Sequence, residues 1–158
     1  SAGEIDENMF TTIAKLNVPY IIMHMQGTPK NMQKNLSYKN ITNEIHSYFK
    51  NKINKLHQLN FYKIVIDPGF GFAKTIKHNY QLLNNLANFK NLKLPILVGI
   101  SRKSMIYSLL DTSPQSALNG TSIINTIALQ NGANILRVHD VQEAIECIKI
   151  TTFAKNNY

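Results

Sequence analysis

The sequence contains a single cysteine, Cys147, and no segment of low-complexity composition. One cysteine excludes an internal disulfide and is typical of proteins from a reducing compartment. Residues 1–4 lack the basic-then-apolar pattern of a secretory signal, and no apolar run approaches the roughly 20 residues of a membrane span. We therefore expect a cytoplasmic protein that does not bind a membrane.

No dense block of basic residues accompanies the net charge of +8, because the lysines are dispersed along the chain. Signatures of the RRM, zinc-finger and helix-turn-helix classes are also absent. We attribute most of the charge to solvated helix faces and expect no nucleic-acid partner, although a basic, non-enzymatic binding module is an alternative. The 158 residues, of which 44% are hydrophobic, favour a single domain with a substantial core.

Four short apolar runs rich in β-branched residues cover 20–23, 64–66, 96–100 and 135–138. They lack the alternation of a half-exposed strand, which is typical of buried parallel strands. Apolar stripes at helical spacing lie within 9–16, 41–59 and 82–89. Ser113 and Pro114 predict the start of a fourth helix, and Asp140 with Glu143 predicts a capped fifth.

This alternation of helices and strands predicts an α/β fold with a parallel sheet and right-handed crossovers. The periodicity is compatible with a doubly wound sheet and with part of a (β/α)₈ TIM barrel. The first predicted helix has no strand before it. We therefore expect the chain to start within a domain, although many domains also open with a helix.

The residues that follow the predicted strands are polar or glycine-rich, and reactive groups of parallel α/β folds gather at such ends. Asp67 follows one strand directly and precedes a proline, so its backbone is extended. Its carboxylate could accept two N–H groups side by side, or it could simply close a turn. The adjacent Gly69–Phe72 stretch favours a ligand site, because Phe72 is unusual in a surface loop and could cover a flat ligand.

Lys103 lies beside Arg102 where the third strand gives way to a helix, with serines on both sides. Two cations, hydroxyls and backbone amides could form an anion site, or the segment could be an ordinary solvated basic loop.

Arg137 and His139 lie two residues apart in the last predicted strand, so alternation places them on one face. A cation within an apolar strand is costly unless it meets an anion, which here could be a ligand or a structural carboxylate. We expect His24 to be a packed, hydrogen-bonded histidine. The remaining histidines lack metal-ligand spacing, so we predict no metal ligand in this chain.

The four strand ends, in this order, resemble those of dihydropteroate synthases. The similarity lies in residues 19–29, 67–75, 99–104 and 137–140, and it departs at Ala73, where a glycine is usual. The resemblance implies a (β/α)₈ TIM barrel of which this chain supplies strands five to eight. Residues 1–158 would then be the C-terminal part of one pterin-binding domain whose N-terminal half is absent from the chain.

The resemblance implies a transferase of folate biosynthesis that is a target of sulfonamides. The enzyme would condense 6-hydroxymethyl-7,8-dihydropterin diphosphate with para-aminobenzoate to give 7,8-dihydropteroate and diphosphate. Mg²⁺ would bind with the substrate diphosphate, through a protein ligand in the absent half. The complete protein would be a homodimer, and the half alone would be inactive. An alternative is another pterin-binding barrel, such as a methyltetrahydrofolate-dependent methyltransferase.

The resemblance also implies a substrate-binding set made of Met23, Asp67, Phe72, Gly99, Lys103, Ser104, Arg137 and His139. In that family pattern Asp67 holds the pyrimidine edge of the pterin, and Lys103 holds polar atoms of its ring. Arg137 lies against the ring and, with His139, holds the diphosphate, so these two and Lys103 are the expected catalytic residues. The others shape the pocket, with Ser104 near the carboxylate of para-aminobenzoate.

Overall fold

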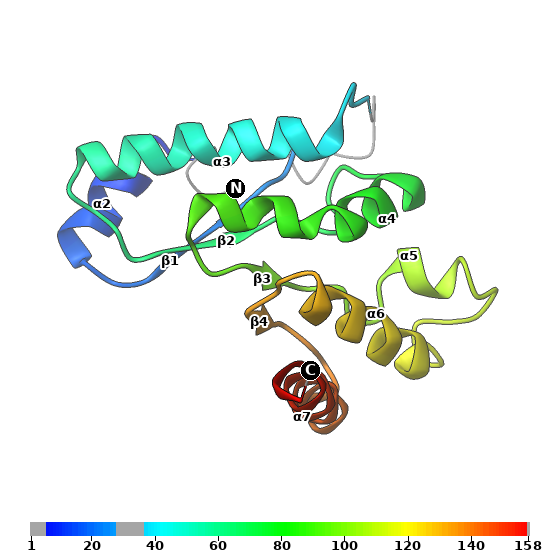
Figure 1. Cartoon of the computed structure of the whole chain (residues 1–158). Helices are drawn as coiled ribbons and strands as arrows, with labels where there is room; N and C mark the ends of the chain where they lie inside the picture. Colours follow the sequence, from blue (N-terminus) through cyan, green and yellow to red (C-terminus); the bar gives the residue numbers. More distant parts are fainter. Residues whose placement is uncertain (1–5, 28–36, 158) are drawn as a thin grey trace.

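The computed structural model describes residues 6–27 and 37–157 (Figure 1). Residues 28–29, which take part in the family resemblance, lie outside the described residues. The strands are β1 (Tyr20–Met23), β2 (Ile64–Asp67), β3 (Leu97–Val98) and β4 (Ile135–Leu136). The helices are α2 (Met9–Leu16), α3 (Ile41–Gln58), α4 (Ile76–Asn84), the 3₁₀ helix η1 (Leu86–Leu92), α5 (Ser104–Tyr107), α6 (Leu118–Gln130) and α7 (Val141–Asn156).

The predicted order of elements is confirmed, but one helix start and one helix cap differ from the prediction. The fourth predicted helix begins at Leu118, because Ser113 closes a turn by accepting the backbone N–H of Ser116 at 3.3 Å. The start predicted at Ser113 and Pro114 is therefore wrong. Helix α7 does follow Asp140, yet that carboxylate makes no cap hydrogen bond to the helix, since Arg102 binds both of its oxygens.

The strands are parallel and follow one another in chain order. β1 pairs with β2 and β3 pairs with β4. The two pairs are joined by a bridge between Ile66 and Ile96, where the Ile66 N–H donates to Pro95 O at 3.0 Å. A doubly wound sheet reverses its strand order, whereas a barrel continues it. The continued order therefore favours the barrel, which the periodicity alone did not decide.

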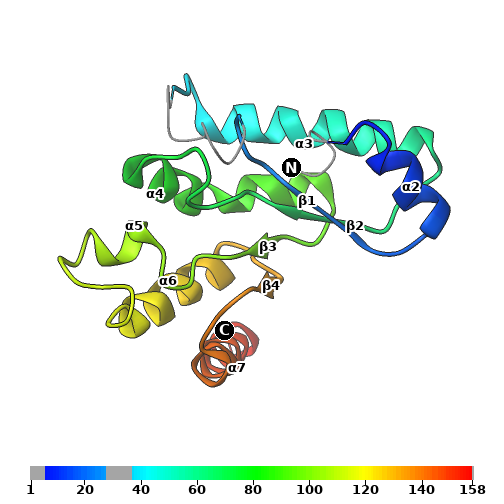
Figure 2. The ribbon, with the colours of Figure 1, turned by 180° about the vertical axis from the view of Figure 1, so that it is seen from behind.

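One face of the strands packs against the helices to form the apolar core. Ile22, Ile66 and Val98 contribute to this core with buried side chains of α3 and α4, such as Phe49 and Leu82. Figures 1 and 2 show α3 and α4 beside β1 and β2, and α6 and α7 beside β3 and β4.

The opposite face of the strands is uncovered at β1 and β4, whereas Leu97 of β3 is buried on the same face. Ile21 pairs with Val65 in register and is 49% exposed, and Ile135 pairs with Leu97 and is 40% exposed. In a closed barrel this is the inward-facing side, which is filled by side chains from strands all around the ring. The described strands therefore present half of a barrel interior.

Candidate active site

Each of the four strands has one predicted site residue at or just beyond its carboxyl end, on the face opposite the core. Met23 is paired in register with Asp67 at the carboxyl ends of β1 and β2. The Arg137 N–H donates to Val98 O at 2.9 Å, which sets Arg137 beside Gly99 just beyond β3 and β4. Because side chains alternate, Asp67 shares the face of Val65, opposite the core. Met23 and Asp67 thus form one pair on this face, and Gly99 and Arg137 form a second pair two positions further along, because the Ile66–Ile96 bridge sets Asp67 opposite Leu97.

Asp67 is a buried carboxylate, with 4% of its surface exposed. Its Oδ1 accepts the backbone N–H of Gly69 at 2.8 Å, so Asp67 also closes the local turn. Burial raises the pKa of Asp67, and the Gly69 amide and the nearby charges of Arg137 and Lys103 oppose that rise. Within the described residues Oδ2 accepts no hydrogen bond. A second acceptor is therefore available for the N–H groups of a ligand.

The loop after β2 depends on backbone conformations with positive φ. Gly71 has a φ of +79°, and a Cβ there would lie 2.9 Å from Cδ of Lys103, so the glycine makes room for that lysine. Ala73 has a φ of 52° although it carries a Cβ, a conformation that costs about 1–2 kcal/mol relative to glycine. The two phenylalanines of the loop have different environments. Phe70 is buried in the core, whereas Phe72 is half-buried beside Lys103.

Lys103 reaches back from the start of α5 into this loop. Its Nζ donates to Phe70 O and lies 4.4 Å from the centroid of the Phe72 ring. Burial, helped by the charge of Arg137 and opposed by Asp67, lowers the pKa of Lys103 to about 8. The structure therefore brings Lys103, Phe72 and Asp67 together, so this lysine does not belong to an ordinary solvated loop.

Lys74 is a member of the site region to which the sequence interpretation assigned no role. It is only 4% exposed, and its Nζ donates to Gly69 O and Phe72 O, both at 2.9 Å. Its third partner is Nδ1 of His24 at 3.1 Å, so Lys74 ties the end of β1 to the loop after β2. Burial lowers the pKa of Lys74 to about 7. No local pattern reveals such a lysine, because lysine is normally exposed.

His24 is packed and hydrogen-bonded, as predicted. It is 7% exposed, and its Nδ1 lies in hydrogen-bond contact with Nζ of Lys74. The centroid of its ring lies 5.0 Å from that of Tyr48, and the two rings pack edge-on.

A pocket of about 190 Å³ opens at the ends of β3 and β4. Its lining residues are Gly99, Ser101, Lys103, Arg137, Val138 and His139. Arg137 passes over Gly99 so closely that a Cβ on the glycine would lie 2.7 Å from Nη2. Ser101 Oγ lies 2.8 Å from Nδ1 of His139. A guanidinium, an ammonium and an imidazole therefore share one small pocket, a combination suited to a multiply charged anion.

Arg137 lies just outside the strand in which it was predicted to lie. β4 ends at Leu136, so Arg137 follows the strand instead of lying within it, and it is exposed in this half of the barrel. The alternative of a structural salt bridge is not observed, since Arg137 makes no ion pair within the described residues. Its charge is therefore available to a ligand.

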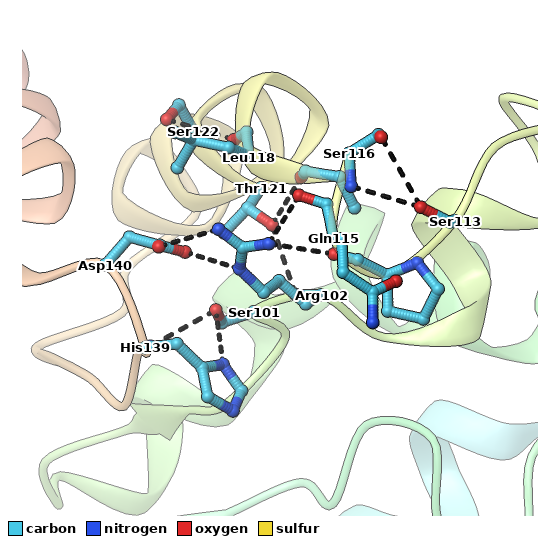
Figure 3. A network of polar contacts seen from close by, with 12 residues as sticks. Ser101, Arg102, Ser113, Gln115, Ser116, Leu118, Thr121, Ser122, His139 and Asp140 are labelled. Atoms are coloured by element: carbon cyan, nitrogen blue, oxygen red, sulfur yellow. Dashed lines mark hydrogen bonds and ion pairs between the residues drawn. The ribbon is translucent and has the colours of Figure 1, made fainter.

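Arg102 does not belong to this pocket, contrary to the two-cation interpretation. Its backbone has a φ of 54°, and its guanidinium binds Asp140 through two parallel hydrogen bonds of 2.9 and 2.8 Å (Figure 3). Nη1 also donates to the carbonyl oxygens of Pro114 and Gln115, at 3.0 and 2.6 Å. Arg102 thus joins the start of α7 to the loop before α6, which is a structural role.

The remaining predicted residue, Ser104, is exposed at the first position of α5, next to Lys103. It does not line the pocket of about 190 Å³. A larger pocket of about 390 Å³ lies between the starts of α3 and α4, and its described lining contains none of the predicted site residues. In the ranges 6–27 and 37–157, no group of three or more His, Cys, Asp or Glu could hold a metal ion. None of the described helices is long and apolar enough to cross a membrane.

Comparison with known proteins places these features in a family. The profile of the family described as "Pterin binding enzyme" matches residues 1–139. The dihydropteroate synthase of Escherichia coli strain K12 is 44% identical over 149 residues, which are 91% of this chain and 53% of that protein. The bifunctional dihydropteroate synthase/dihydropteroate reductase of Helicobacter pylori is 45% identical over 130 residues, which are 82% of this chain and 34% of that protein.

Solved structures agree with this comparison. The Yersinia pestis dihydropteroate synthase in a sulfonamide drug complex superposes with a TM-score of 0.91 at 40% identity, over 94% of this chain and 55% of that one. The Xanthomonas albilineans dihydropteroate synthase in complex with 7,8-dihydropteroate gives 0.85 at 31% identity, over 95% and 55%. The expected fold class is thereby confirmed: the chain forms about half of a (β/α)₈ barrel, and it spans about half the length of these two enzymes.

Proposed function

The chain belongs to the family of pterin-binding enzymes, and from that premise we propose that it supplies the C-terminal half of a dihydropteroate synthase. The complete enzyme condenses 6-hydroxymethyl-7,8-dihydropterin diphosphate with para-aminobenzoate to give 7,8-dihydropteroate and diphosphate, a step of folate biosynthesis. The observation that carries this proposal is the gathering of Met23, Asp67, Gly99 and Arg137 at the strand ends, where Lys103 and Arg137 are close enough to act on the Asp67 carboxylate. These groups match a flat, hydrogen-bonding ring that bears an anionic tail.

The two ends of this site recognise different parts of the pterin substrate. Asp67 accepts N–H groups of the pyrimidine edge, because its Oδ2 has capacity for them and its surroundings are cationic. Lys103 donates to polar ring atoms, and Phe72 covers the bicyclic ring or the neighbouring arylamine. Ser104, at the start of α5, lies near the carboxylate of para-aminobenzoate.

The diphosphate occupies the pocket at the ends of β3 and β4, where Arg137 and His139 act on the leaving group. As the bond from the pterin methylene to the diphosphate breaks, negative charge grows on the departing oxygen. Arg137 and His139 stabilise that charge, and the bound ring is held in place for attack by the arylamine nitrogen. The aniline nitrogen is neutral at pH 7, so the step does not require a strong general base.

Mg²⁺ is expected to accompany the diphosphate, but the described residues do not form a site for it. They contain no cluster of three or more His, Cys, Asp or Glu in reach of one ion. We therefore assign no step to Mg²⁺ here and propose that its protein ligand lies in the other half of the barrel. The homodimer, the cytoplasmic location, the sulfonamide sensitivity and the single-domain assignment of residues 1–158 stay predictions.

The alternatives lack a comparable observation. A methyltransferase that uses a pterin needs the ring contacts but no diphosphate site, whereas Arg137, Lys103 and His139 converge on one pocket. A nucleic-acid module would be expected to show a continuous basic face, whereas Lys74 and Lys103 are directed into the strand-end loops.

The test is to restore a complete barrel by joining the N-terminal half of the E. coli relative ahead of this chain, giving a hybrid enzyme. The two inner strand faces would then cover each other, and we expect the hybrid to release diphosphate only when both substrates are present. The chain alone should be inactive, because half of the barrel interior is uncovered. Methyl transfer to a corrinoid by the hybrid, without turnover of para-aminobenzoate, would contradict the proposal. Binding of random duplex DNA that weakens steeply with salt would instead support the nucleic-acid module.

A further inference from the structure

A buried serine controls the imidazole of His139. Ser101 is 5% exposed and follows β3 after Gly99 and Ile100. Its Oγ lies 2.8 Å from Nδ1 of His139, and the backbone N–H of His139 donates to the same Oγ at 3.3 Å. Figure 3 shows both contacts and the ring of His139 turned away from the Arg102 network. The hydroxyl of Ser101 therefore contacts both the ring nitrogen and the backbone nitrogen of His139.

Counting hydrogens determines which ring nitrogen carries the proton. Ser101 Oγ already accepts the backbone N–H, and its own hydrogen needs an acceptor because an unpaired buried hydroxyl is costly. In the described part of the chain, Nδ1 of His139 is the one acceptor that contacts Oγ. If Nδ1 carried the proton of a neutral ring, it would also donate to Oγ and the hydroxyl hydrogen would have no partner. Ser101 therefore donates, and Nδ1 is the acceptor.

We propose that Ser101 is a positioning residue that fixes neutral His139 in the tautomer protonated on Nε2, so that Nε2–H donates to the bound anion. The identity of that anion as diphosphate rests on the proposed function, whereas the tautomer does not. The second ring nitrogen of a histidine is commonly set by the hydrogen bond that the first one makes. The donor then needs no further proton to bind an oxyanion.

The charges around His139 explain why a neutral ring that donates from Nε2 suits this pocket. Arg137 from the end of β4 and Lys103 from the loop before α5 line the same pocket, and both are cations. Asp140, the next residue in the chain, is the nearby carboxylate, and it is engaged by Arg102. A neutral imidazole adds a hydrogen-bond donor to this pocket without adding a third positive charge beside Arg137 and Lys103.

The tautomer can be read directly from the ring nitrogens. We would label the histidines of the full chain with ¹⁵N and record their spectra at alkaline pH, where an imidazole is neutral. We expect a bare Nδ1 and a protonated Nε2 for His139, and a gain of the Nδ1–H form in Ser101→Ala. Ser108→Ala removes an exposed serine from the same segment and should leave the spectrum of His139 unchanged. A protonated Nδ1 in the unmodified chain would overturn the inference, even if Ser101→Ala failed to fold.

Binding of inorganic pyrophosphate to the hybrid enzyme tests the consequence. At alkaline pH, Ser101→Ala should weaken binding by about two- to tenfold, the weight of one neutral hydrogen bond. This penalty should shrink at acidic pH, because an imidazolium carries a hydrogen on Nε2 whatever Ser101 does. A penalty that is equal at both pH values would mean a general structural role and would overturn the inference. Absence of pyrophosphate binding would count against the proposed function, while the spectra would still decide the tautomer.

Discussion

Lys74 Nζ lies 3.1 Å from Nδ1 of His24, and the two side chains are only 4% and 7% exposed. When Lys74 is an ammonium it must donate, so Nδ1 of His24 then carries no proton and accepts. Burial, with the charge of Lys74 as the second cause, lowers the pKa of His24 from 6.5 to about 3. This pair therefore links the closure of the strand-end loops to the protonation state of one histidine.

The first prediction concerns acid stability. The unfolded chain protonates His24 near pH 6.5, whereas the folded chain does so only near pH 3. The unfolded state therefore binds the extra proton between these values, and the stability present above pH 6.5 is lost as the pH falls. The expected loss from this one histidine between pH 8 and pH 5 is about 2 kcal/mol. Urea unfolding at both pH values measures it.

His24→Asn provides the matched comparison, since an amide oxygen can replace Nδ1 as the acceptor for Lys74 but does not titrate. We expect the stability of this variant to fall by about 2 kcal/mol less than that of the unmodified chain over the same pH interval. Parallel losses in both proteins would show that His24 is not the group responsible.

The second prediction concerns recognition of the pterin. In Asp67→Asn the amide oxygen can still accept the Gly69 N–H, so the turn is kept. The amide nitrogen, however, presents a donor to the N–H edge of the ligand, and a mismatched buried polar contact costs about 1–3 kcal/mol. Affinity of the hybrid enzyme for an unphosphorylated pterin should therefore fall by about tenfold or more, as measured by calorimetry. Asp111→Asn, an exposed carboxylate outside the site, is the control. Equal affinity of Asp67→Asn and the control would remove Asp67 from the site.

The parts of the fold that follow from local sequence patterns were predicted better than the parts that depend on contacts between distant segments. The runs at 20–23 and 64–66 reported β1 and β2 well, because apolar periodicity and strand length are local properties. β3 and β4 are shorter than their runs, since pairing ends where the chain turns to form the site. Ser113 and Pro114 carry a genuine start signal, but a turn satisfies it instead of a helix.

The residues of the candidate site likewise divide into those that local sequence patterns reveal and those that only distant contacts reveal. The position of Met23, Asp67 and Arg137 at strand ends and on one face follows from strand length and alternation, both readable in sequence. The burial of Lys74 and the engagement of Arg102 with Asp140 do not, because each depends on contacts between segments distant in sequence or on an unusual φ. A cation in a motif can bind a ligand or hold a loop, and only the partner distinguishes the two.

The third prediction uses Gly99 as a probe of Arg137. A Cβ at position 99 would lie 2.7 Å from Nη2 and 3.0 Å from Nε of Arg137, so Gly99→Ala displaces the end of a flexible, exposed side chain. The backbone of Gly99 is not in the positive-φ region, so alanine can adopt it. We expect folding to be kept, and pyrophosphate affinity of the hybrid enzyme to fall by about tenfold because charge-assisted bonds are lost.

The double variant decides whether the two residues act together. Arg137→Ala should reduce pyrophosphate affinity at least as much as Gly99→Ala, with stability changed by about 0.5 kcal/mol or less, since the side chain is exposed. Arg137→Lys should recover part of the loss, because it restores the charge but not the planar fork. In the Arg137→Ala background the alanine at position 99 should add no further penalty, because the group it displaces is gone. Binding of an unphosphorylated pterin should suffer less than binding of pyrophosphate in every variant. Additive penalties, or equal penalties for the two ligands, would mean that Arg137 serves the ring or the fold instead of the leaving group.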